Sequence, residues 1–105
     1  MSEAQLLSAI MRAAEWLPDV LLLRNNSGAR GRVRFGLQNR QLRTGSPDLI
    51  ACVRGRFVAL EVKLPGQSPR PDQKAFLEAI RASGGEAYVV TSVDEALEAL
   101  REASK

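Results

Sequence analysis

The apolar residues at the start of the chain recur with the spacing of an α-helix. Ser2 and Gln5 match a helix-opening capping box, in which each side chain caps a main-chain N–H of the first turn. Apolar side chains then follow every three or four positions as far as Leu17, and Pro18 cannot continue the pattern. The pattern predicts a first helix that runs to about Trp16.

Two later segments have the same helical periodicity. Pro71 is suited to the first position of a helix through "DQKAFLEAIRAS", which we expect to end at Gly84 or Gly85. Ser92 and Glu95 match a further capping box ahead of a final helix.

Four short apolar runs have the length and composition of β-strands. They are "VLLLR" (20–24), "DLIACV" (48–53), "RFVALEVK" (56–63) and "EAYVVT" (86–91). The element order is therefore α, β, β, β, α, β, α, which predicts an α/β fold: a mixed sheet with a central β-hairpin and helices on both faces. In such a sheet we expect Cys52 to be a buried apolar residue.

Length and composition limit the possible functions. The 105 residues, 45% of them hydrophobic, are enough for one domain spanning 1–105. One cysteine, no histidine and no bilayer-spanning apolar run favour a reducing, cytoplasmic location without a membrane anchor. The lack of histidine excludes His-ligated zinc and Ser-His-Asp catalysis, so any catalysis must use carboxylates, lysine, amides or hydroxyls.

Positive charge is concentrated in one third of the chain. Eight arginines and a single acid, Asp48, lie between residues 24 and 56, whereas the whole chain has a net charge of only +3. Because the guanidinium fork suits phosphate, this distribution favours nucleic acid as the partner. The alternative is a charged loop that only keeps the protein soluble.

Two carboxylates lie in the apolar strands of the predicted hairpin. If the hairpin turns on Arg54 and Gly55, Asp48 lies opposite Glu61 on the same face, with Cβ atoms about 5 Å apart. Facing like charges are destabilising, and Lys63, on the face of Glu61, neutralises only one of them. A divalent cation with oxygen ligands, Mg²⁺ or Mn²⁺, would neutralise both.

Other interpretations of these residues remain open. Arg-Gly is a poorer two-residue turn than Asn-Gly, and a bulge would shift the register by one residue. Taken singly, Asp48 matches an ordinary turn residue, and Glu61 with Lys63 matches an exposed strand pair. On the second helix, Gln73 shares a face with Leu77, so its amide points inward near the helix N-terminus.

The motifs "SPD" and "EVK", followed by the helix start "RPDQ", resemble the core of PD-(D/E)xK nucleases. More closely, "GSPDLIACVRGRFVALEVKLPGQSPRPDQKAFLEAIRASGGEAYVVTSVDEAL" resembles the virus-type replication-repair nuclease domain, VRR-NUC. The likeness extends to "SEAQLLSAIMR" and "RNNSGARG" near the N-terminus. The resemblance implies a restriction-endonuclease-like fold and metal-dependent hydrolysis of DNA.

The resemblance also implies roles for individual residues. Asp48 and Glu61 would bind the metal with the Val62 carbonyl, and Glu3 would complete the ligand set, although a helix dipole alone also favours an acid there. Lys63 would position the attacking water, and Gln73 would support the site. The residues that would contact the DNA backbone are Arg24, Asn25, Asn26, Arg30, Arg32 and Arg34.

Small standalone members of this family look like phage or prophage Holliday-junction resolvases. We therefore expect a structure-selective endonuclease that leaves 5′-phosphates and, because a four-way junction needs two symmetric incisions, acts as a homodimer. Two alternatives are a nonspecific or flap-directed nuclease and a noncatalytic, basic nucleic-acid-binding module.

Overall fold

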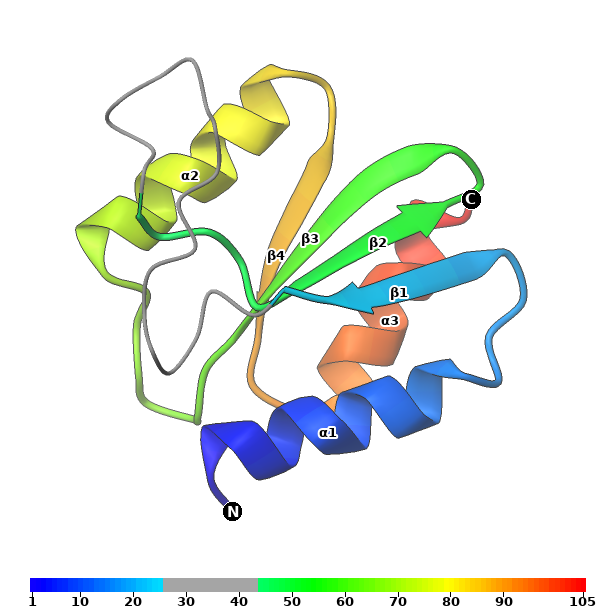
Figure 1. The fold of residues 1–105 in the computed structure, drawn as a ribbon, viewed down its shortest axis with the longest axis horizontal. Helices are drawn as coiled ribbons and strands as arrows, with labels where there is room; N and C mark the ends of the chain where they lie inside the picture. Colours follow the sequence, from blue (N-terminus) through cyan, green and yellow to red (C-terminus); the bar gives the residue numbers. More distant parts are fainter. Residues whose placement is uncertain (26–43) are drawn as a thin grey trace.

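A computed structural model describes residues 1–25 and 44–105 (Figure 1). Within these ranges, the predicted order of helices and strands is confirmed. The elements are α1 (Glu3–Ala14), β1 (Val20–Arg24), β2 (Leu49–Val53), β3 (Arg56–Val62), α2 (Pro71–Ala82), β4 (Glu86–Val90) and α3 (Val93–Ala103). No helix in these two ranges is long and apolar enough to cross a membrane.

The strands form one mixed sheet in the order β1-β2-β3-β4. β2 pairs antiparallel with β1 on one side and with β3 on the other, and β4 pairs parallel with β3. The parallel pair requires a crossover, which α2 provides. Helices cover both faces, as predicted: α2 lies on one face, and α1 and α3 lie on the other (Figure 1).

The main core lies between the sheet and the pair α1 and α3. Fully buried side chains of both helices, including Ile10 and Leu100, pack there against Leu49, Val58 and Leu60 of the central strands. A smaller core lies under α2, where Leu77 and Ile80 pack on alanines of β3 and β4. This division follows from the period-two alternation of β3, whose side chains point to opposite faces in turn.

The hairpin between β2 and β3 has the predicted two-residue turn. Val53 faces Arg56, and the pairing continues outward to Leu49 and Leu60. Arg54 and Gly55 have φ values of 51° and 83°, as a type I′ turn requires. The unfavourable conformation of Arg54 costs about 1–2 kcal/mol, which the ladder of five residue pairs offsets.

Some local predictions were wrong. Cys52 is exposed. It alternates with Ala51 and Val53 of the main core and so lies on the α2 face, where the core under α2 includes residues of β3 and β4 but none of β2. α1 ends at Ala14, and a tight final turn carries Trp16 outward, 84% exposed. Ser92 caps α3 as expected, but Glu95 accepts bonds from the main chain and hydroxyl of Thr91 instead of completing a capping box.

Candidate active site

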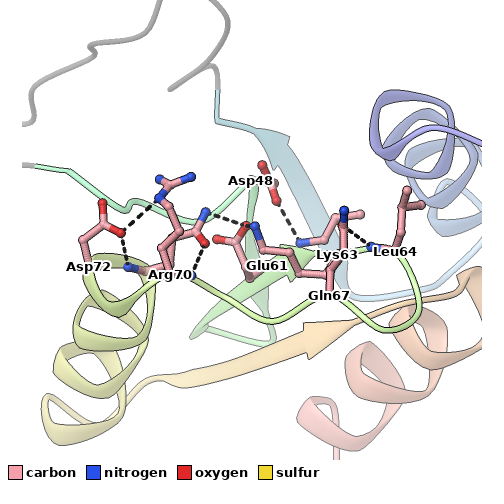
Figure 2. A network of polar contacts seen from close by, with 9 residues as sticks. Asp48, Glu61, Lys63, Leu64, Gln67, Arg70 and Asp72 are labelled. Atoms are coloured by element: carbon pink, nitrogen blue, oxygen red, sulfur yellow. Dashed lines mark hydrogen bonds and ion pairs between the residues drawn. The ribbon is translucent and has the colours of Figure 1, made fainter.

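Asp48 and Glu61 lie side by side at the end of the sheet where β2 begins and β3 ends (Figure 2). The observed hairpin register, extended by one residue beyond Leu49 and Leu60, places the two acids opposite each other. The Oδ2 atom of Asp48 accepts a 2.8 Å hydrogen bond from the main-chain N–H of Val62. The aspartate side chain is therefore fixed against the strand that carries Glu61.

Glu61 is a buried carboxylate with too few partners. Its residue is only 1% exposed, and its Oε1 atom has no hydrogen-bond partner. The Oε2 atom lies 3.3 Å from the amide nitrogen of Gln73 and 3.9 Å from the ammonium nitrogen of Lys63. An oxygen left without a partner in a buried site is costly, so Glu61 has a place for one further positive or hydrogen-bonding group.

The environment of Glu61 disfavours its ionised form. Desolvation by burial, contact with the carboxyl group of Asp48 and the charge of Glu3 raise the pKa of Glu61 to about 9, although Lys63 lowers it. Without a cation, Glu61 therefore holds a proton at neutral pH next to Asp48. If both acids were ionised, Lys63 would balance only one of the two negative charges. The site therefore lacks one positive charge.

Gln73 has a fixed orientation at the N-terminus of α2. Its side-chain oxygen accepts a 2.8 Å bond from the main-chain N–H of Arg70, which can only donate. The other end of the amide must then be the NH₂ group, which donates to Glu61. The first turn of α2 thus holds the side chain that orients the buried carboxylate.

The segment before Asp48 is packed tightly on the same helix terminus. Gly45 has a φ of +83°, and a Cβ atom there would lie 2.5 Å from the main-chain carbonyl carbon of Asp72. Partial burial raises the pKa of Asp72, but hydrogen bonds from Arg70 and Thr44 outweigh this effect, and the pKa is lowered. Sequence reasoning missed these contacts, although the glycine before "SPD" and the acid in the first turn of a helix were visible signals.

Polar burial in the described residues is confined to this region. The buried polar or charged residues are Ser46, Glu61, Lys63 and Gln73. Three of the four are candidate site residues, and Ser46 lies two positions before Asp48. Because buried charges are costly unless they are paired, this concentration marks the region as the candidate functional site of the described residues.

The two further ligands implied by the resemblance differ in position. Val62 directs its N–H to Asp48, and in an extended strand its carbonyl points to the same side. Glu3 is near enough for its charge to raise the pKa of Glu61. Among the described residues, however, no three histidine, cysteine or acidic side chains lie close enough to hold a metal.

Comparison with known proteins identifies the family. The VRR-NUC domain profile matches residues 19–94, which include the hairpin, both carboxylates and α2. The chain belongs to the VRR-NUC family. A solved structure of a VRR-NUC domain superposes with a TM-score of 0.66 and 23% sequence identity over 94% of each chain, which supports the same fold. No curated protein matches the chain.

Membership of the VRR-NUC family makes this chain a nuclease of the PD-(D/E)xK type, with DNA as the substrate. Nucleases of this family generally use divalent metals, and the residues here fit such an ion. The site offers oxygen donors from Asp48 and Glu61, which magnesium and manganese prefer, and one of them is the unpartnered Oε1. An ion at this position would remove the electrostatic cost of the two facing acids.

Two of the candidate DNA-contact residues lie in the described part of this VRR-NUC chain, and their surroundings differ. Arg24 is exposed at the end of β1, paired with Leu49 next to the site. Asn25 donates from its side chain to the carbonyl of Pro47 and from its main chain to that of Asp48, so it holds the motif segment in place. The other candidates, Asn26, Arg30, Arg32 and Arg34, lie outside the described residues.

Proposed function

We propose that this VRR-NUC domain is a Mg²⁺- or Mn²⁺-dependent endonuclease that cuts branched DNA, with a four-way junction as the preferred substrate. The observation that supports the metal site best is the buried, incompletely bonded carboxylate of Glu61 opposite Asp48. Such a pair is destabilising by itself and becomes favourable when a divalent cation binds between its members.

The residues have separate tasks in this proposal. Asp48, Glu61 and the Val62 carbonyl would hold the ion, which supplies a bound water as nucleophile and a Lewis acid for the phosphate. Lys63 is 8% exposed, and its ammonium group lies 3.9 Å from Glu61. From there it would donate hydrogen bonds to the attacking water and to a phosphate oxygen on which charge develops.

The surroundings keep this arrangement rigid. Gln73 fixes the rotamer of Glu61 through its oriented amide, and the Val62 N–H fixes Asp48. Arg24, at the open end of β1, would bind the DNA backbone and position the strand without reading its sequence. Glu3 would act on the ion through a water or through its charge, since no three-acid cluster forms in the described part of the chain.

A four-way junction has two equivalent strands to cut, and the described chain has one candidate site. Paired incisions therefore require two copies related by a twofold axis. The proposed active form is a homodimer that presents two sites to one junction. Products would carry a 5′-phosphate, because the attacking oxygen comes from water and the leaving group is the 3′-hydroxyl.

The test uses labelled four-way junction, flap, linear duplex and single-stranded DNA, each with Mg²⁺, Mn²⁺ or EDTA. The site variants are Asp48→Asn and Lys63→Met, and Glu98→Gln on the exposed face of α3 is the matched control. We expect paired, symmetric, metal-dependent nicks in the junction. Each site variant should lose at least about 100-fold in rate, as for other charge-stabilising catalytic groups, and the control should lose nothing.

Other outcomes separate the alternatives. Equal cleavage of all substrates would retain the metal site and exclude junction selectivity, in favour of a nonspecific nuclease. Preferential cleavage of the flap would indicate a flap-directed enzyme. Salt-sensitive DNA binding without cleavage in any metal would support the noncatalytic binding module and refute the proposal.

A further inference from the structure

β1 is an edge strand whose apolar side chains are exposed. Leu21 is 63% exposed and Leu23 is 55% exposed, although both belong to the sheet. β1 pairs with β2 on one side, and the described residues supply no partner on its other side (Figure 1). Between Val20 and Arg24 the strand has no proline, lysine or acid, which are residues that usually protect an edge from pairing with another chain.

The hydrogen-bonding direction of each β1 residue follows from a single contact. The N–H of Asn25 bonds to the carbonyl of Asp48, so Asn25 directs its main-chain groups to β2. In an antiparallel ladder this direction alternates from one residue to the next, so Leu21 and Leu23 also direct their main-chain groups to β2. The residues that direct their N–H and C=O groups to the open side are therefore Val20, Leu22 and Arg24.

The opposite edge of the sheet differs in charge. Three carboxylates of α3, those of Glu95, Glu98 and Glu102, line the hollow beside β4, and Glu86 begins that strand. Two copies that met through β4 would bring these like charges together, which is unfavourable. The charge distribution therefore leaves β1 as the edge suited to a second copy.

The geometry points to β1 as the strand through which two copies of this chain join, in an antiparallel pair centred on Leu22. In this register Leu22 faces the same residue of the second copy, and Val20 faces Arg24. All three outward-directed residues of each copy then form ladder hydrogen bonds, which a register shifted by one residue would not allow. This inference rests on the homodimeric nuclease proposed above and names its interface.

Side chains fit the same register. Leu21 of one copy faces Leu23 of the other at a position without ladder bonds, where Cβ atoms are about 5 Å apart. The four exposed leucines then cover one another on one face of an eight-stranded sheet. At each end of the pair Arg24 faces Val20 of the other copy, the residue that follows Asp19, so an acid and a base lie in the same region there.

The arrangement has a consequence for catalysis. The twofold axis of an antiparallel pair is perpendicular to the sheet, so both active sites lie on the same face. Asp48 and its counterpart are separated by three strand spacings across the sheet and by six residues along it, or about 25 Å in an untwisted sheet. Two sites on one face at this distance suit two strands of one junction.

The first experiment measures mass in solution without DNA or metal, by sedimentation or light scattering from 1 to 100 µM. We expect wild type at twice the 11.5 kDa chain mass. The double variant Leu21→Lys with Leu23→Lys places four ammonium groups together and should raise the dimer dissociation constant at least about 100-fold. Val89→Lys, an exposed apolar position on β4, is the control and should remain dimeric.

The second experiment tests the register by rescue. Leu21→Lys combined with Leu23→Glu places an introduced ammonium group of one copy opposite an introduced carboxylate of the other, so the dimer should return. Circular dichroism checks that each variant folds. A wild type that stays monomeric, a dimeric double-lysine variant, or the absence of rescue would overturn the inference.

The cleavage assay separates this inference from the proposed function. The monomeric double-lysine variant should still nick DNA in a metal-dependent manner but lose paired junction incisions. Paired incisions by that monomer would contradict the inference alone. Absence of all cleavage by a dimeric wild type would contradict the proposed nuclease and leave the interface intact.

Discussion

Replacing Glu61 by glutamine should stabilise the metal-free protein and abolish metal-dependent cleavage. Burial, Asp48 and Glu3 raise the pKa of Glu61 from 4.5 to about 9. At neutral pH the unfolded chain carries Glu61 ionised, so folding has to take up a proton. Because the folded pKa is the higher one, the stability that Glu61 contributes is complete below pH 4.5 and is lost as pH rises towards 9. Glutamine cannot titrate and avoids this loss.

The size of the effect follows from the two pKa values. Each pH unit between them contributes about 1.4 kcal/mol to the free energy of unfolding. A pH of 7.5 is three units above 4.5, so the free energy of unfolding of the wild type is lowered there by at most about 4 kcal/mol. The variant does not lose this stability. At pH 5 the difference falls below about 1 kcal/mol. The introduced amide is close to the size of the protonated acid, and its oxygen can accept from Gln73 as Glu61 does, so packing changes little.

Urea denaturation in EDTA between pH 5 and 8.5 measures this difference directly. The unfolding free energy of Glu61→Gln minus that of wild type should rise with pH by about 1.4 kcal/mol per unit. Glu98→Gln, an exposed substitution on α3, should give a flat difference. A flat line for Glu61→Gln, or a variant less stable than wild type at pH 8, would refute the argument that Glu61 is held protonated.

Three further predictions concern the same region. Mg²⁺ should raise the melting temperature more at pH 8.5 than at pH 6, because binding releases the proton of Glu61, and scanning fluorimetry measures this. Gly45→Ala should lower the free energy of unfolding by more than about 2 kcal/mol, because the added Cβ would meet the main chain of Asp72. Gly66→Ala is the control: the space around Gly66 is open, so this change should cost only about 1 kcal/mol. Urea denaturation measures both. Gln73→Leu should raise the Mg²⁺ concentration for half-maximal cleavage about tenfold, and an unchanged value would mean that its amide does not orient Glu61.

The sequence was sufficient to predict the central geometry of the site. The period of two along a strand and the two-residue turn together determine which residues face each other, so counting outward from Arg54 and Gly55 brought Asp48 opposite Glu61. Gln73 was predictable for a similar reason, because helical periodicity placed it on the buried face of α2. Both inferences needed only local periodicity.

Contacts between segments distant in the sequence were not predictable in this way. No periodicity indicates that Gly45 would pack on the first turn of α2, or that the N–H of Arg70 would orient Gln73. These contacts depend on how far the helix is shifted along the sheet, which packing of side chains from several elements determines. The unpartnered oxygen of Glu61 is a result of this packing, and it is the feature that most strongly indicates a cation site.

The error on Cys52 has a different cause and could have been avoided. A helix is about 10 Å wide and strands are about 4.8 Å apart, so one helix covers about two strands. The face with α1 and α3 has two helices for four strands, but the described residues provide only α2 for the other face. About half of that face then has no described helix over it, in keeping with the exposure of Cys52, Leu21 and Leu23. Since the number of helices follows from the element order, the amino-acid sequence alone is enough to mark apolar residues on the uncovered strands as candidates for an interface.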